Sequence, residues 1–391
     1  MKRSICFAAF AVAIAAFACL DYLGAYPSAP PVLNGFYLTL PWDGGSHAEA
    51  AFQALAGTTI PMSSYSFAST KDNSTRTGTI VGTSPFVTPL AGTSINAVII
   101  PLKITIGSTV FDPTASNSCD LGISALSRFQ NSPLVAAVPN LTIGGVNVGN
   151  SQFINGFRRA EFWTKINGSS SYQNPINYTT AATVSLSAGT HGTTYNGGST
   201  CKLLGIVSNS WLDGQLKTLM ASLRSSGVLS TTQFAIFLLR DVVQSSVDPP
   251  NTSNCCILGY HGATGNPVQT YSPMDWDTTG LFGSGTADGS VSAHEIGEWM
   301  DDPLGTNGTP KWGNIGQVSG CQGNLEVGDP LSGKLMPAIT MNGKAYHMQE
   351  LAYFSWFFNK LGTASLGGGG KFSSNGTFTG PSKVCPSGGT Y

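Results

Sequence analysis

The residues of this chain best suited to chemistry lie within five consecutive positions, which read H-E-I-G-E from His294 to Glu298. The 391 residues include five histidines and six glutamates, so chance would place an H-E-x-x-E pattern in about one such chain in a thousand. On a helix, His294 and Glu298 project from one face about one turn apart. H-E-x-x-H helices use this spacing to present two metal ligands, with the intervening glutamate as general base. The stretch therefore predicts a metal site with His294 and Glu298 as ligands and Glu295 as the catalytic base.

Two ligands are too few for a hydrolytic zinc site, which needs about three protein ligands and an open position for water. The third must come from a distant part of the chain, and we place Glu326 first, followed by Asp329 and His347. Asp302 would lie about 12 Å from His294 along a straight helix, too far to share one ion unless the chain turns back. Asp302 therefore suits a supporting or capping role better.

The glutamate at position 298 alters the metal that the site should prefer. If Glu326 also binds, two anionic ligands would lower the Lewis acidity of the ion and make a harder site. We expect one Zn²⁺ ion, with Ca²⁺, Mn²⁺ and Mg²⁺ as alternatives. The other interpretation of the same residues is a solvated helix face with a hydrogen-bonded histidine, which needs no metal.

The composition limits the partners. Hydrophobic residues make up 41% of the chain, enough for a large core, and the length allows one large domain or two ordinary ones. Only 10% of the residues are charged and the net charge is −1, so no basic field exists to bind nucleic acid. We expect a peptide or protein substrate, and the sequence leaves the oligomeric state open.

The N-terminus has the pattern of a secretory signal. Lys2 and Arg3 precede an apolar run over residues 5–20, and small residues follow it. The pattern predicts a signal peptide over residues 1–25 and a secreted protein with no membrane span after its removal. A lipid anchor on Cys19, or retention in the periplasm, is the alternative.

The cysteines indicate disulfides. Six remain after signal removal: Cys119, Cys201, Cys255, Cys256, Cys321 and Cys385. An even number in an exported chain favours disulfides. Cys255 and Cys256 would point to opposite faces of a strand, so we expect them to have different partners. A bridge from Cys321 to either of them would anchor the stretch before Glu326 near the start of the metal-binding helix.

The fold expected is α+β, with two regions between the signal peptide and a tail. Residues 26–200 are rich in short strands and turns, among them a β-branched run at 94–106. Residues 201–362 carry the candidate site, and residues 363–391 form a Gly/Ser-rich tail that we expect to be poorly ordered except near Cys385.

The second region alternates strands and helices. We expect strands at 203–208 and 233–243, a helix at 211–223, an exposed strand at 268–274 and an aromatic helix at 346–359. The site helix begins at Ser290 or Ser292 and ends at Asp302, because Pro303 follows. His261 falls in a loop-rich section, and a lone loop histidine is more often structural than a ligand.

Residues 203–331 resemble a zincin-like metallopeptidase domain. His294, Glu295 and Glu298 stand on the H-E-x-x-H positions, and Glu326 resembles the downstream glutamate of gluzincin sites. This resemblance implies a zincin-like α+β domain and zinc-dependent cleavage of peptide bonds.

A fainter resemblance, to exordium-like, phosphate-induced secreted proteins of plants, rests on the acid-Pro end of the helix at Asp302 and the E-V-G-D stretch at 326–329. It implies an extracellular protein with no proven catalysis. The sequence therefore predicts a secreted zinc peptidase. The competing prediction is a non-catalytic secreted protein, for adhesion or cell-wall association, with a structural metal site.

Overall fold

The computed structural model describes residues 33–41, 59–87, 90–360, 362 and 365–385, and these belong to one compact unit. The predicted signal peptide lies outside the described residues. Both helices and many strands are present, so the chain has the α+β composition expected from its sequence. Within the described part, no helix is long and apolar enough to span a membrane.

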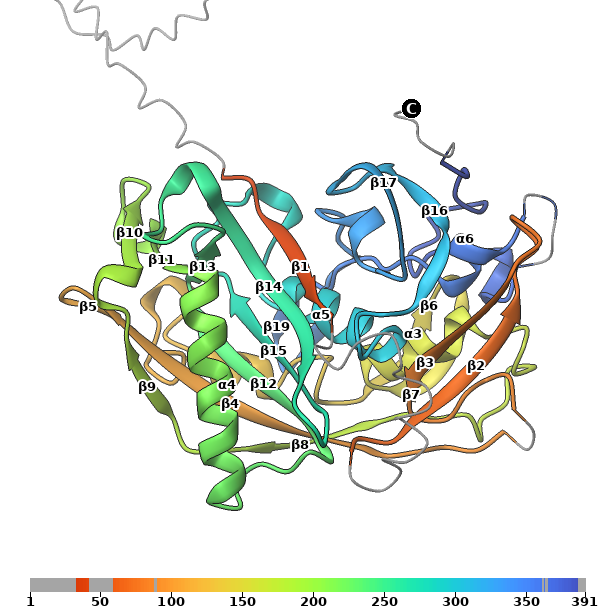
Figure 1. The fold of residues 1–391 in the computed structure, drawn as a ribbon, viewed down its shortest axis with the longest axis horizontal. Helices are drawn as coiled ribbons and strands as arrows, with labels where there is room; N and C mark the ends of the chain where they lie inside the picture. Colours follow the sequence, from red (N-terminus) through yellow and green to blue (C-terminus); the bar gives the residue numbers. More distant parts are fainter. Residues whose placement is uncertain (1–32, 42–58, 88–89, 361, 363–364, 386–391) are drawn as a thin grey trace, which may run out of the picture. The chain divides into compact units, whose positions relative to one another are not determined.

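An eleven-stranded mixed sheet forms the centre of the fold, with the main order β10-β11-β13-β14-β15-β12-β4-β5 (Figure 1). Strand β1 adds to β14, and strands β8 and β9 add to β4. Its strands are β1 (Phe36–Leu40), β4 (Ile95–Ile106), β5 (Thr109–Phe111), β8 (Ile176–Thr180), β9 (Val184–Ser187), β10 (Gly192–Asn196), β11 (Leu203–Ser208), β12 (Gln233–Arg240), β13 (Val242–Ser245), β14 (Cys255–Thr264) and β15 (Gln269–Trp276).

The sheet joins the two regions expected from the sequence. Strand β4, from the first region, pairs in parallel with β12, which in turn pairs in parallel with β15. Strands from both sides of residue 200 therefore share one sheet. The β-branched run of β4 is suited to this central place because ten of its twelve residues are buried or half-buried apolar or β-branched side chains.

Four two-stranded ribbons, five α-helices and several short 3-10 helices make up the other elements of the described chain. The ribbons pair β2 (Met62–Ala68) with β3 (Thr75–Val81), β6 (Val138–Ile143) with β7 (Val146–Ser151), β16 (Gly308–Ile315) with β17 (Val318–Asn324), and β18 (Ile339–Met341) with β19 (Lys344–Tyr346). The helices are α2 (Ala125–Gln130), α3 (Phe153–Glu161), α4 (Asn209–Ser225), α5 (Ser290–Asp301) and α6 (Phe354–Phe358).

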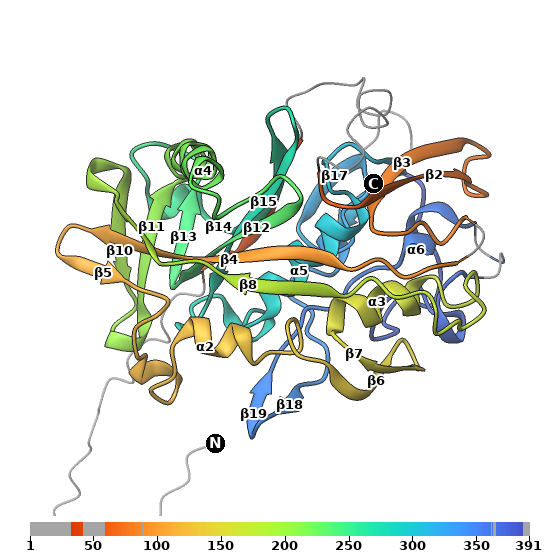
Figure 2. The ribbon, with the colours of Figure 1, turned by 90° about the horizontal axis from the view of Figure 1, so that it is seen from below.

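Helices cover both faces of the sheet, as the view from below shows (Figure 2). On one face, α4 packs Leu212, Leu216 and Met220 into a cluster with alternate residues of β4 and β12. On the other, α5 packs into a larger cluster with the intervening residues of the same strands. This alternation is what two-sided burial of a strand requires.

Several predicted elements are confirmed, and others need correction. The strand at 203–208, the helices near 211–223 and 290–302, and the strand that becomes β12 are present. The section around His261 is not a loop but the buried strand β14, and β15 is not exposed, because it lies between β14 and β12 with every residue buried.

The aromatic stretch at 346–359 is helical only over α6. Its first half instead pairs with distant segments, through bridges of Gln349 with Leu335 and of Ala352 with Ser373. The tail is also better packed than its composition predicts, because Phe372, Ser373 and Ser374 are buried. Tertiary pairing has overridden local propensity in both places.

The three disulfides join Cys119 to Cys201, Cys255 to Cys256, and Cys321 to Cys385. The predicted bridge from Cys321 to Cys255 or Cys256 is wrong. The ribbon β16–β17 lies against the C-terminal segment, where the N–H of Cys385 donates to the carbonyl of Lys311 over 3.0 Å. The different partners expected for Cys255 and Cys256 are also wrong, because these two neighbouring cysteines are joined to each other.

Candidate metal centre

Helix α5 presents its polar residues inside the protein. All twelve of its residues are buried. It ends as predicted before Pro303, where the carboxylate of Asp302 accepts hydrogen bonds from the N–H groups of Thr306 and Asn307. Close packing against β14 depends on Gly259, because a Cβ there would lie 2.9 Å from the side chain of Glu295.

Five polar side chains on and around α5 form two overlapping sets that share Glu298. In the first, Nε2 of His294 lies 3.1 Å from Glu298 and 3.6 Å from Asp329. In the second, Nδ1 of His261 lies 3.5 Å from Glu295 and 3.6 Å from Glu298. Within each set the ligand atoms lie within 4.8 Å of one another, close enough to hold one metal ion.

Asp329 reaches the site because the chain after β17 is bound to α5 through Glu298. The Oε1 atom of Glu298 accepts from the N–H groups of Gly328 and Asp329, at 3.0 and 3.2 Å. Glycine is required at 328, since a Cβ there would overlap the imidazole of His294. The turn can therefore approach the helix closely enough to bring Asp329 beside His294.

The other acids expected from the sequence take different places. Glu326, our first choice as third ligand, is buried beside Glu298 and accepts from Asn324, but it belongs to neither converging set. Asp302 caps the end of α5, as expected from its distance. His347 is paired with Asp288 at 3.0 Å and is about a third exposed, so it is not among the converging groups.

His261 is the ligand candidate that sequence reasoning missed. Its Nε2 lies 3.2 Å from the carbonyl oxygen of Asp302, which can only accept, so Nε2 carries the proton. Nδ1 therefore presents its lone pair to Glu295 and Glu298, an arrangement that orients metal-binding histidines. A signal existed in the sequence, because Gly259 and His261 alternate on one strand face and glycine there allows a helix to come close.

Burial and charge together favour a cation at this centre. Both ring nitrogens of His294, both carboxylate oxygens of Glu295, Nδ1 of His261 and Oε2 of Glu326 are buried without an aligned hydrogen-bond partner. Buried polar atoms rarely lack a hydrogen-bond partner, and a group of such atoms is explained by a bound ion or water. The donor set of imidazoles and carboxylates fits a divalent metal.

The acidic side chains of the centre outnumber its imidazoles, and burial and the charges of neighbouring groups shift the pKa values of both kinds of group. Burial raises the pKa of Glu295 to about 7, and burial together with Glu298 raises that of Asp329 to about 6. Burial would lower the pKa of His294, but Glu298 raises it well above the usual value. For Glu298 the neighbouring His294 outweighs burial and lowers the pKa. The raised pKa values of Glu295 and Asp329 reflect the cost of ionising crowded carboxyl groups away from water, a cost that a bound cation would lower.

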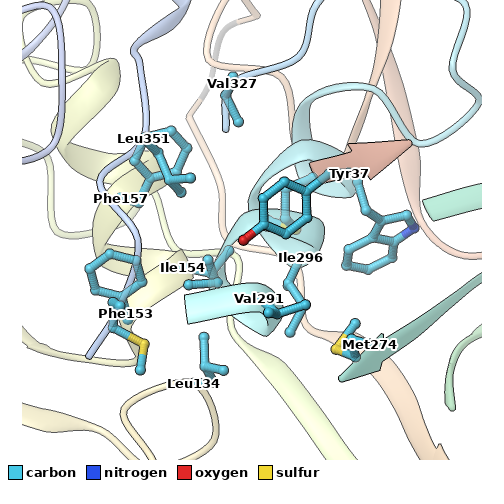
Figure 3. Packing of buried hydrophobic residues seen from close by; sticks show 14 of the residues in the cluster. Tyr37, Leu134, Phe153, Ile154, Phe157, Met274, Val291, Ile296, Val327 and Leu351 are labelled. Atoms are coloured by element: carbon cyan, nitrogen blue, oxygen red, sulfur yellow. The ribbon is translucent and has the colours of Figure 1, made fainter. Parts of the chain in front are cut away.

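Two further residues enclose the centre. The ring of Tyr37, on β1, stacks on the imidazole of His294 with centroids 3.6 Å apart. Figure 3 shows Tyr37 lying over α5, beside Ile296 and Val291. The side chain of Gln317 binds the backbone of Tyr37 and donates to Asp329. Neither residue had a local sequence signal, since both come from elements far from α5 along the chain.

No family model, curated protein or solved structure matches this chain. The zincin-like and exordium-like resemblances therefore stay predictions.

Proposed function

We propose that this chain is an exported, metal-dependent peptidase, with His294, Glu298 and Asp329 as metal ligands and Glu295 as general base. The observation that carries the proposal is the convergence of these buried donors around Glu298, with several of their atoms lacking hydrogen-bond partners. The three disulfides and the predicted signal peptide support export.

Each residue has a distinct task in this proposal. A divalent ion, zinc by preference, supplies Lewis acidity when bound and stabilises negative charge developing on a carbonyl oxygen. Glu295 takes a proton from the attacking water, and its pKa of about 7 suits a base that works near neutral pH. Nδ1 of His261, 3.5 Å from Glu295 and 3.6 Å from Glu298, offers a further nitrogen donor to the ion.

The test begins with metal content. Purified wild-type protein should contain about one zinc or similar ion per chain, measured by elemental mass spectrometry, and His294→Ala should lose it. His347→Ala is the matched control and should keep the metal, because His347 pairs with Asp288 away from the converging donors. If the wild-type protein contains no metal and a chelator leaves its thermal stability unchanged, the proposed metal centre is contradicted.

A second measurement separates an enzyme from a binding protein. Glu295→Gln should keep metal and fold but lose hydrolysis of a broad peptide library, because the amide cannot accept the proton. The competing function is a non-catalytic secreted protein with a structural metal site, and the observation that favours it is that His294 and Glu295 have no exposed surface. Equal inertness of wild type and Glu295→Gln would establish that alternative.

A further inference from the structure

Strand β1 lies on the edge of β14 that passes the candidate centre. Gly259 and Gly262 of β14 each pair with β15 on one side and with β1 on the other. Strand β13 pairs with β14 on the β15 side, because Phe36 of β1 and Gln244 of β13 pair with Ile257 from opposite sides. This edge of β14 would be open without β1, and an open edge can accept any extended chain. Figure 1 shows β1 running beside β14 toward α5.

The backbone of Tyr37 is held from both sides. Its neighbours in β1 pair with β14, while its own N–H and carbonyl face the opposite direction. There the side-chain amide of Gln317 accepts from the N–H of Tyr37 at 2.9 Å and donates to its carbonyl at 3.0 Å. A side-chain amide that bonds to both the N–H and the carbonyl of one residue makes the hydrogen bonds that a neighbouring strand would make. Such contacts recognise any extended peptide, whatever its sequence.

The contacts of the side chains define one specific position. Tyr37 points to the centre and stacks on His294, whereas Leu38 and Leu40 pack on the opposite face of the sheet. Glycines make room for the strand, because a Cβ at Gly262 would lie 3.0 Å from Cβ of Leu40 and one at Gly305 would lie 2.9 Å from Thr39. The groove is thus shaped to a chain with an aromatic side chain at the position of Tyr37.

We propose that β1 occupies the substrate groove of this protein, and that the ligand which replaces it is an extended peptide with an aromatic side chain on His294. The peptide adds to the edge of β14 as an extra strand, in the mode known as β-augmentation. Because β1 fills the groove and buries the centre, the chain as folded is autoinhibited. The word substrate rests on the function proposed above, whereas the peptide binding does not.

The full-length chain allows a test in both directions. The probe is a fluorescein-labelled peptide with the sequence of residues 33–41, and binding is followed by fluorescence anisotropy in a Glu295→Gln background, so that no cleavage intervenes. Tyr37→Ala loosens β1 and should bind the probe at least tenfold more tightly than the parent. A probe with alanine in place of the tyrosine should bind at least tenfold more weakly to the same protein.

A crosslink provides the opposite perturbation. Leu40 and Gly262 are register partners, and a shift of about half an ångström brings their Cβ positions into disulfide range, so oxidised Leu40→Cys/Gly262→Cys should lock β1 and abolish probe binding. Leu40→Cys alone, oxidised in parallel, is the matched control and should bind the probe at least as well as the parent.

The outcomes separate this inference from the proposed function. If Tyr37→Ala binds the probe no better than the parent and the crosslink changes nothing, β1 is a permanent strand and the inference is overturned. If Tyr37→Ala does not fold, the crosslinked protein provides the test, and probe binding equal to that of the parent would overturn the inference. If the chain with intact Glu295 binds the probe but never cleaves it, the peptide-binding inference stands and the proposed peptidase function fails.

Discussion

Glu298 is the residue that the two donor sets have in common. One carboxylate oxygen faces His294 and the turn at 328–329, and the other faces His261. A histidine at this position could not serve both directions with equivalent atoms, because its ring offers one lone pair in the neutral form. The glutamate of the H-E-x-x-E pattern therefore allows α5 to bind β14 and the turn after β17 at once.

The third ligand can be identified by comparing two acids. Asp329→Asn should weaken zinc binding at least a hundredfold, because Asp329 lies 3.6 Å from Nε2 of His294 and belongs to the converging set. Glu326→Gln should weaken it less, since Glu326 is adjacent but outside that set. Competition titration with a zinc-chelating dye measures both constants. A larger loss of zinc affinity in Glu326→Gln than in Asp329→Asn would favour Glu326 as third ligand, as expected from the sequence.

At the scale of elements, α5 is anchored at its C-terminal end by a buried arginine on α3. The guanidinium of Arg158 donates to the carboxylate of Asp301 and to the carbonyl of Met300, and it lies 3.6 Å from Glu161. All three charged side chains are inaccessible to solvent. The position of the face of α5 that carries the candidate ligands therefore depends on an ion pair that connects it to a separate helix.

Removal of that arginine should be costly. Arg158→Met leaves two buried carboxylates without their counter-ion and should lower the free energy of unfolding by about 3–5 kcal/mol. Arg76→Met is the control, because its ion pair with Asp72 is partly exposed and should contribute under about 1 kcal/mol. Urea denaturation of both variants gives the comparison, and equal losses would show that the buried pair adds nothing.

Three buried carboxyl groups meet where β12, β13 and β15 adjoin. One carboxyl oxygen of Asp275 accepts a hydrogen bond from the N–H of Val242. Its other oxygen is buried with no aligned hydrogen-bond partner. Burial, followed by Asp277 and Asp241, raises the pKa of Asp275 well above its usual value. Burial and Asp277 likewise raise the pKa of Asp241 to about 7. In the folded protein these groups keep protons that the unfolded chain releases near pH 4.

This difference makes stability fall as pH rises. A carboxyl whose pKa is raised by folding contributes most below its unfolded pKa, and the contribution is lost as pH approaches the folded value, about 7 for Asp241. Asp275→Asn removes one member of the group, so it should be more stable than wild type by about 2 kcal/mol at pH 8 and nearly equal at pH 5. Urea unfolding at both pH values tests this, and identical pH slopes would contradict it.

The sequence predicted the local parts of the site and missed the distant ones. Helix α5 and its ligands could be found because their spacing is set by one helical turn. Tyr37 could not, and the alternation of Gly259 with His261 gave no partner for that strand, since strand pairing over long sequence separations brings both residues to α5. The same holds for β15, whose place inside the sheet depends on β4 and β14 rather than on its own residues. No local pattern encodes which strand lies beside which.

At the scale of the whole molecule, two long-range disulfides have different positions relative to the centre. Cys321 lies on β17, from which Gln322 and Asn324 donate to Asp329 and Glu326. The bridge from Cys321 to the tail therefore holds the strand that leads into the third ligand. The bridge between Cys119 and Cys201 joins segments that carry none of the candidate ligands.

These two bridges form a natural matched pair. They close loops of similar length, with sequence separations of 82 and 64, so removing either one by serine substitution should cost about 4 kcal/mol of stability. Unfolding is measured in chelator, so that metal binding adds nothing. Zinc affinity should fall at least tenfold only when Cys321 and Cys385 are replaced, because only that change frees the turn carrying Asp329. An equal loss of affinity in both variants would mean that general destabilisation, rather than the position of β17, governs the centre.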